Sequence, residues 1–309
     1  MTGRTLERAA WSCLGAGIVG SVVHVLGGAT NIGSVVYGLA LLAIVVSTVI
    51  SATRHQLDRR ILSGFFVIIA AIIIGQLFSA ASLGAVEHLV AEVAFFVVQI
   101  TLVLGLLLVA QRRIGREPLG ILADASILSL GAWLVVWIVV LRPLFDTVSN
   151  EPFVAGVRGL TFSLSAVVLF LLVTLLLGDS DNSTVVWLAS SAILSSLIGD
   201  VLWALHEAEV ITTSLAVRNA PYVMALFAAC ATLLHPGIRN LTAQGSYHAA
   251  RPMAGRLVVV ISGLVVPIAV FALTDAQDTR DRIVRTVSVL FLSGVVLLRV
   301  VIAVRANAQ

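Results

Sequence analysis

The chain has 309 residues, of which 59% are hydrophobic and only 11% are charged, and its mean hydropathy is +1.08. Such a chain lacks the polar surface that a soluble protein needs, so the composition predicts an integral membrane protein, and the net charge of +3 is not the footprint of a nucleic-acid-binding protein. All 19 basic residues are arginine, and the absence of lysine excludes Schiff-base chemistry such as that of a retinal pigment. Cys13 and Cys230 lie in apolar segments and are predicted to be buried thiols.

Ten apolar segments are long enough to span a bilayer. They are residues 8–28, 33–52, 61–83, 89–110, 119–142, 156–177, 185–205, 213–235, 257–274 and 286–305. Only helices satisfy their backbone hydrogen bonds in lipid at this length, so we expect an all-α, polytopic transmembrane bundle that forms a single membrane domain over residues 1–309. The first segment resembles a signal peptide but lacks a clear cleavage site, so we expect it to be retained. Its GAGIVG (15–20) matches a dinucleotide-binding pattern, but no strand precedes it, and we expect these glycines to let helices approach closely.

Arginine placement predicts the orientation. With the N-terminus in the cytoplasm, 12 of the 19 arginines fall on the inner side: Arg4, Arg8, Arg54, Arg59, Arg60, Arg112, Arg113, Arg116, Arg239, Arg251, Arg256 and Arg305. The positive-inside rule thus favours an orientation with both termini in the cytoplasm. The last two segments are the least constrained, because three arginines in AQDTRDRIVR (276–285) would lie outside.

An internal repeat is indicated by two stretches that begin at Gly75 and Gly199. Each contains a span, an outer loop, a span and an inner arginine, and the alignment sets Gln76 against Asp200. Residues 8–110 and 119–235 are then either parallel four-span copies, followed by a final hairpin at 257–305, or similar by chance.

Charged residues inside apolar spans are candidate functional residues, because each is costly in a bilayer. Asp200 and Arg218 lie at similar depths in two spans joined by a short loop, so we expect them to pair near the outer face, with Glu207 two turns from Asp200 and Asn219 next to Arg218. Gln76 joins this set through the repeat. The group is interpreted either as a structural clamp between helices or as a ligand site or switch.

A second pair is expected on the cytoplasmic side. Asp124 lies a few residues into the span at 119–142, and Arg299 lies a few residues from the end of the span at 286–305. This pair would couple the last helix to the bundle, again as a clamp or as a switch.

Enzyme and metal motifs are not found in the sequence. It has no G-x-S-x-G, H-E-x-x-H, C-x-x-C or Walker pattern, and no soluble stretch long enough for a catalytic domain. No His, Asp or Glu pair has the close spacing of a metal motif, so we expect no catalytic domain, metal or cofactor in this chain.

Three stretches carry a resemblance to a known family: LADASILSLGAWLVVWIVVLRPLF from Leu122, GDVLWAL from Gly199 and RNAPYVMALFAACATLLHPGIRNLT from Arg218. They resemble the multi-span membrane region at the N-terminus of many actinobacterial GGDEF and GGDEF/EAL proteins, which make and degrade cyclic-di-GMP. In those proteins the last helix leads into a coiled linker and a GGDEF domain, whereas here the sequence stops at VRANAQ. The resemblance implies a sensory domain that works as a homodimer and is linked to a cytoplasmic output domain or partner.

The leading expectation is therefore a bacterial membrane sensory domain in which a change around Asp200 and Arg218 shifts the bundle and moves the last helix. The first alternative is a small ten-span transporter or channel lined by Asp200, Arg218, Asp124 and Arg299. The second alternative is a partner subunit of a larger membrane complex.

Overall fold

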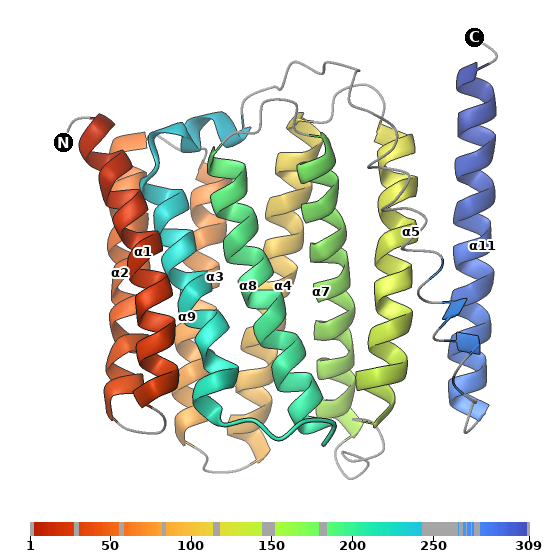
Figure 1. Ribbon diagram of the computed structural model, residues 1–309, viewed down its shortest axis with the longest axis horizontal. Coiled ribbons are helices and arrows are strands. Elements are labelled where there is room, and N and C mark those ends of the chain that lie inside the picture. Colours follow the sequence, from red (N-terminus) through yellow and green to blue (C-terminus); the bar gives the residue numbers. More distant parts are fainter. Residues whose placement is uncertain are drawn as a thin grey trace.

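Helices make up nearly all of the described chain in the computed structural model, and no β-strand occurs among the described residues (Figure 1). The structure describes residues 3–27, 31–55, 59–81, 85–113, 118–143, 152–178, 184–242 and 279–307, together with 265, 268, 269, 271, 272 and 274. The elements are α1 (Gly3–Gly27), α2 (Asn31–His55), α3 (Arg59–Ala81), α4 (Ala85–Arg113), α5 (Pro118–Val136), the π-helix η1 (Trp137–Leu141), α7 (Pro152–Gly178), α8 (Thr184–Glu207), α9 (Leu215–Leu234), the 3₁₀-helix η2 (Pro236–Thr242) and α11 (Thr279–Asn307).

Seven of the described helices are long and apolar enough to cross a membrane, namely α1, α2, α3, α4, α8, α9 and α11. The α5 and α7 regions contain shorter apolar stretches, at Ser129–Val139 and Gly159–Val173. The predicted all-helical class is thus confirmed among the described residues, and the seven long apolar helices are consistent with the predicted membrane protein. Most of the expected span at 257–274 lies outside the described residues.

The last helix begins earlier than predicted. The sequence places the start of this span at residue 286, whereas α11 starts at Thr279. The difference arises because Asp281 and Arg285 were assigned to an exposed loop on account of their charge. Both are buried, at 1% and 2% exposure, and belong to the first turns of the helix.

The helices form one bundle with α9 well inside it and α11 at one edge (Figure 1). Helix α9 packs against α1, α2 and α8, while α4 packs between α3 and α7. Helix α5 packs against α7, and α11 in turn packs against α5. The start of α1 and the end of α11 lie at the same end of the bundle.

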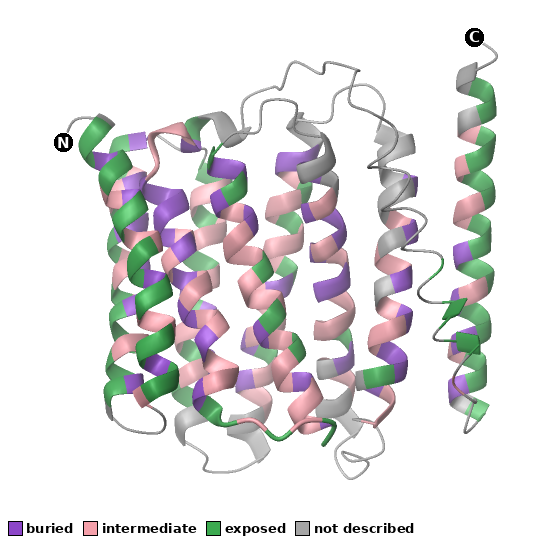
Figure 2. Ribbon diagram, viewed as in Figure 1, coloured by how far each residue is buried: buried purple, intermediate pink, exposed green. Residues whose placement is uncertain are grey.

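The burial pattern agrees with a bundle surrounded by lipid. Val223, Ala228, Cys230 and Leu233 of α9 are fully buried. The outer faces of α1 and α11 are instead largely exposed (Figure 2), and Leu26, for example, is 82% exposed. Apolar side chains on the perimeter are what a hydrocarbon solvent requires.

A close helix contact explains one glycine of the first span, Gly17. A Cβ on Gly17 would lie 2.8 Å from Cβ of Phe227 on α9, so the missing side chain allows α1 to approach α9. This contact agrees with the packing interpretation of GAGIVG.

Candidate functional site

The carboxylate of Asp200 on α8 is the point at which four helices meet through polar contacts. Gln99 Nε2 of α4 donates to Asp200 Oδ2 at 2.9 Å, and Ser165 Oγ of α7 donates to the same oxygen at 3.2 Å. The hydroxyl of Tyr222 on α9 donates to Asp200 Oδ1 at 2.8 Å. We call these four residues, Gln99, Ser165, Asp200 and Tyr222, the Asp200 cluster. Each of its members comes from a different helix, so its hydrogen bonds depend on the relative positions of all four helices.

The Asp200 cluster lies deep in the bundle when it is measured along α4 and α7. Gln99 is the central residue of α4, with 14 residues on either side, and Ser165 is the central residue of α7, with 13 on either side. The prediction that Asp200 lies nearer the outer face used only its position along α8. A polar group at the middle of long apolar helices is costly and therefore needs partners, which the three donors supply.

Gly199 makes the contact between Tyr222 and Asp200 sterically feasible. A Cβ at this position would lie 2.7–2.9 Å from three carbons of the Tyr222 ring. The ring therefore packs directly on the backbone of α8, and its hydroxyl reaches the neighbouring carboxylate. Any larger residue at position 199 would displace the ring.

The expected ion pair between Asp200 and Arg218 is not formed, since none of the ion pairs or hydrogen bonds of Asp200 among the described residues involves Arg218. The guanidinium of Arg218 instead lies over the ring of Trp203, with Cζ 4.3 Å from the ring centroid. Asp200 lies seven residues before the end of α8, and Tyr222 lies seven residues after the start of α9, whereas Arg218 lies only three residues after it. Arg218 is thus one turn too close to the helix end to face Asp200.

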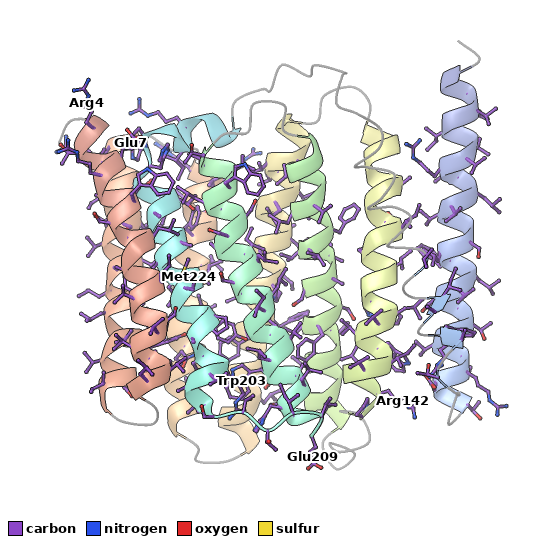
Figure 3. All side chains as sticks on the ribbon, viewed as in Figure 1. Arg4, Glu7, Arg142, Trp203, Glu209 and Met224 are labelled. Carbon is purple, nitrogen blue, oxygen red and sulfur yellow. The ribbon has the colours of Figure 1, made fainter. Side chains whose placement is uncertain are left out.

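Asn219 joins the Arg218 contact and not the Asp200 cluster. The indole Nε1 of Trp203 donates to Asn219 Oδ1 at 3.3 Å. Trp203 therefore contacts both Arg218 and Asn219 of α9 near the C-terminal end of α8. Figure 3 shows Trp203 near this end of the bundle, close to the loop that carries Glu209. Glu207 is the last residue of α8 and is half-buried there.

Gln76, the residue aligned with Asp200, is half-buried on α3 and is not brought to the Asp200 cluster. Helix α3 packs mainly against α4 and also contacts α2. The structure thus separates this candidate from the others.

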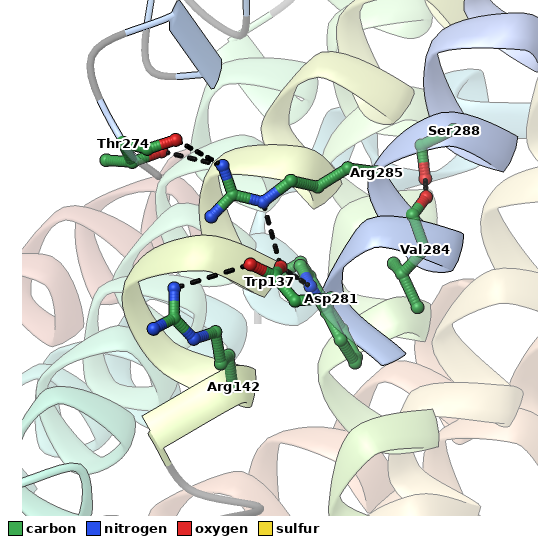
Figure 4. Close-up of polar contacts among 7 residues, drawn as sticks. All are labelled: Trp137, Arg142, Thr274, Asp281, Val284, Arg285 and Ser288. Atoms are coloured by element: carbon green, nitrogen blue, oxygen red, sulfur yellow. Dashed lines mark hydrogen bonds and ion pairs between the residues drawn. The ribbon is translucent and has the colours of Figure 1, made fainter. Parts of the chain in front are cut away.

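A second buried cluster fixes α11 to the end of α5 (Figure 4). Asp281 Oδ1 accepts from Arg285 Nε at 2.8 Å and from Trp137 Nε1 at 3.0 Å, and Asp281 Oδ2 lies 3.5 Å from Arg142 Nη1. Arg285 Nη1 also donates to the backbone oxygen of Thr274, at 2.7 Å, and to its hydroxyl, at 2.9 Å. We call Trp137, Arg142, Thr274, Asp281 and Arg285 the Asp281 cluster.

The π-helix η1 presents Trp137 to this cluster. Such wide turns are uncommon and occur frequently at functional sites. Trp137 stacks on Trp133, with ring centroids 5.9 Å apart, and Trp133 Nε1 donates to Ser163 Oγ on α7 at 2.8 Å. The two tryptophans thus connect Ser163 of α7 to Asp281 of α11.

The expected pair of Asp124 and Arg299 is only partly described. Arg299 lies seven residues beyond buried Leu292, on the stripe of α11 that includes Asp281, Arg285 and Ser288. Helix α11 packs against α5, which contains Asp124, but the side chain of Asp124 lies outside the described residues. The predicted neighbourhood of the two helices is therefore present.

The turn after α9 closes the opposite end of the bundle. Arg239 of η2 donates from Nε to the backbone oxygen of His55 at 3.0 Å, and from Nη2 to that of Arg54 at 2.7 Å. It thereby caps the last carbonyls of α2. The backbone N–H of Gly237 donates to His235 Nδ1 at 3.1 Å, which shapes the His-Pro-Gly turn.

Sequence reasoning missed three residues of the Asp200 cluster. The sequence does not predict Gln99, Ser165 or Tyr222 as partners of Asp200. A usable signal for Tyr222 was present, since it is as far from the α8–α9 loop as Asp200 is. For Gln99 and Ser165, no pattern in one sequence tells which helices are neighbours.

The described residues contain no group of three or more His, Cys, Asp or Glu side chains that could hold a metal ion. No family model matches the chain, and neither a curated protein nor a solved structure gives a match.

Proposed function

We propose that this chain is the membrane-embedded input domain of a bacterial signalling protein, similar to the regions that precede GGDEF domains. In this proposal the Asp200 cluster is the input site, and α11 carries the response to a cytoplasmic output domain or partner. Paired action would suit a homodimer.

The observation that carries this proposal is a continuous set of contacts from the Asp200 cluster to α11. Ser165 contacts Asp200, and Ser163, two residues earlier on the same helix, accepts the hydrogen bond of Trp133. Trp133 stacks on Trp137, which donates to Asp281 at the start of α11. A shift of α7 that follows a change at Asp200 would therefore be felt at the first turn of α11 through groups in direct contact. This unbroken path of contacts supports energetic coupling between the Asp200 cluster and α11. A measurement of that coupling is needed to establish it.

The proposal includes the finer topology of ten spans, with repeats at 8–110 and 119–235 and a final hairpin at 257–305. Two glycines aligned in the repeat make similar contacts, which supports it. A Cβ on Gly75 would lie 3.0 Å from the Phe95 ring of the next helix, much as a Cβ on Gly199 would meet Tyr222. The packing of α2 against α9 and of α7 against α4 also corresponds under this repeat.

We further propose that the chain lies in the inner membrane with both termini in the cytoplasm. The positive-inside rule supports this orientation, and Figure 1 is compatible with it, because α1 begins and α11 ends at the same end of the bundle. The Asp281 cluster, at the start of α11, would then be nearer the outer side.

The test joins the full chain to a GGDEF reporter through a coiled linker and measures cyclic-di-GMP in cells. We expect Asp200→Asn, Arg218→Ala and Trp133→Phe to change the output while the amount of protein in the membrane stays the same. Matched controls are Glu209→Gln, on an exposed loop residue, and Trp187→Phe, at a tryptophan that is 57% exposed. Output unchanged by all three test variants would contradict the proposal.

A ten-span transporter is the second candidate, and the depth of the Asp200 cluster is the observation that favours it. A carboxylate beside the central residues of α4 and α7 is where a substrate or ion would be bound midway across a membrane. Flux into proteoliposomes that is lost in Asp200→Asn would place this function first.

A further inference from the structure

Exposed arginines gather at the end of the bundle where α1 begins and α2 ends. We call the following residues of α1, α2, α3 and η2 the arginine patch: Arg4, Arg8, Arg54, Arg59, Arg60 and Arg239. Helix α2 contacts α1, α3 and η2, so the four elements meet at one corner. Among the described residues of these four termini, Glu7 is the only acid, and the sequence of the α2–α3 link adds Asp58. Positive charge therefore dominates the patch.

Ion pairs within the chain do not neutralise this charge. The guanidinium groups of Arg4, Arg8, Arg54 and Arg59 make no ion pair or hydrogen bond with the described residues. Glu7 lies within one turn of both Arg4 and Arg8, yet it is paired with neither. Figure 3 shows Arg4 at the start of α1, directed away from the bundle. These donors are therefore available to water or to a group outside the chain.

The exposed face of α1 continues from the arginines as an apolar stripe (Figure 2). At intervals of three or four residues it presents Arg4, Arg8, Trp11, Gly15, Ile18 and Val22, all of them exposed. The Trp11 side chain is 50% exposed, and tryptophan favours the headgroup level of a bilayer. A Cβ on Gly15 would meet no atom within 4 Å, so the surface next to Trp11 is open. The stripe thus passes from charge, through an amphipathic ring, to an apolar surface.

We propose that this face of α1 binds an anionic phospholipid. The lipid phosphate accepts hydrogen bonds from Arg4 and Arg8, whose planar guanidinium groups suit phosphate oxygens. Trp11 packs at the boundary between headgroup and acyl chain, and the acyl chain lies over Gly15 and the aliphatic side chains beyond it. The order of groups along α1 is therefore the order of groups in a phospholipid, from phosphate to hydrocarbon.

The rest of the arginine patch selects a headgroup with net negative charge. Arginines near a membrane surface attract anionic lipids over about one Debye length, roughly 10 Å at 0.1 M salt. Phosphatidylcholine has the same phosphate, but its quaternary ammonium cancels that attraction. A soluble polyanion would contact the arginines and leave the apolar stripe unused. The inference depends on the proposed membrane location, but it depends neither on the signalling role nor on which end of the bundle faces the cytoplasm.

The test uses the purified, delipidated full chain in a neutral detergent. Native mass spectrometry measures the affinity of the first lipid bound when dioleoylphosphatidylglycerol or dioleoylphosphatidylcholine is added. We expect phosphatidylglycerol to bind at least about tenfold more tightly, and Arg4→Gln/Arg8→Gln to lose about tenfold or more of that affinity. The matched control Arg282→Gln/Arg305→Gln removes two exposed arginines of α11 and should bind as the wild type does.

Two single variants keep the test valid if the double arginine variant does not fold. Glu7→Gln removes the acid beside the two arginines and should raise the affinity for phosphatidylglycerol about fivefold. Gly15→Leu changes no charge but fills the position of the acyl chain, and it should lower the affinity. Its control is Gly38→Leu, at an exposed glycine of α2 where a Cβ also meets nothing within 4 Å, and this variant should have no effect.

Two results would overturn the lipid site. One is equal affinity for the two lipids, or equal affinity of the wild type and the Arg4→Gln/Arg8→Gln variant for phosphatidylglycerol. The other is displacement of the lipid by inorganic phosphate together with normal binding in Gly15→Leu, which would indicate a site for free anions. Because lipid binding is read in the isolated chain and signalling in the reporter fusion, failure of one is distinguishable from failure of the other.

Discussion

Tyr222 of α9 donates a 2.8 Å hydrogen bond to the Asp200 carboxylate of α8, across two antiparallel helices joined by a short loop. The two residues lie at the same distance from that loop. The contact therefore fixes the register of the hairpin at a point well inside the bundle.

Removing this hydroxyl should destabilise the bundle measurably. Tyr222→Phe deletes a hydrogen bond to a charged acceptor, so we expect a loss of about 1.5–3 kcal/mol in the free energy of unfolding, measured by thermal and denaturant unfolding in detergent. Tyr37→Phe is the matched control, because Tyr37 packs in the core formed by α2, α3 and α9 without a hydrogen bond from its hydroxyl to the described residues. Equal losses in both variants would show that the bond contributes little.

Gly199→Ala should disrupt the same contact without touching any polar atom. The added Cβ would lie within 2.7–2.9 Å of the Tyr222 ring, and overpacking of this kind costs about 1–3 kcal/mol. Gly105→Ala on α4 is the control, since a Cβ there meets nothing within 4 Å, and its effect should be neutral or slightly stabilising. The melting temperatures of the two variants test this prediction, and an equal effect of both substitutions would contradict it.

Asp281→Ala should be among the most damaging single changes in the chain. It leaves Arg285, which is 2% exposed, without its carboxylate partner, at a cost of about 3–5 kcal/mol. The double variant Asp281→Ala/Arg285→Met removes the stranded charge and should recover part of that loss. If the double variant is less stable than the single one by the full cost of a second lesion, the pair does not act as a unit.

Arg239→Ala should loosen the end of α2. Its two donors cap the carbonyls of Arg54 and His55, and a charge-assisted cap of this kind contributes about 0.3–1 kcal/mol. We expect faster amide hydrogen exchange in η2 and the adjoining end of α2, with little change in global stability. Arg4→Ala, at an exposed arginine of α1, is the control and should leave this exchange unchanged.

The helical fold was predictable because its signal is local. Apolar runs of sufficient length predict membrane-spanning helices, and seven helices of this length and apolarity are found among the described residues. The boundary at Thr279 was missed for a physical reason, since Asp281 and Arg285 neutralise each other in a buried pair, and hydropathy counts each as if it were solvated.

The site was only half predictable. Asp200 stands out because a carboxylate in an apolar span is rare. Counting residues from the loop limits which residues of the next helix could contact it. The predicted partner, Arg218, was chosen for its charge and lies one helical turn too close to the loop. Tyr222 lies at the same distance from the loop as Asp200. The partners on α4 and α7 depend on which helices pack together, and that information is carried by long-range contacts rather than by spacing.

Helix α11 has one polar stripe and one wide apolar surface. Asp281, Arg285, Ser288 and Leu292 are buried, whereas Leu290, Leu297 and Val304 on other faces are each more than 60% exposed. Against lipid, one apolar face is worth about as much as another, so van der Waals packing alone resists rotation of this helix only weakly. Turning it about its axis would instead carry Asp281 and Arg285 into hydrocarbon, so the angular position of α11 is set by where its charges can remain paired.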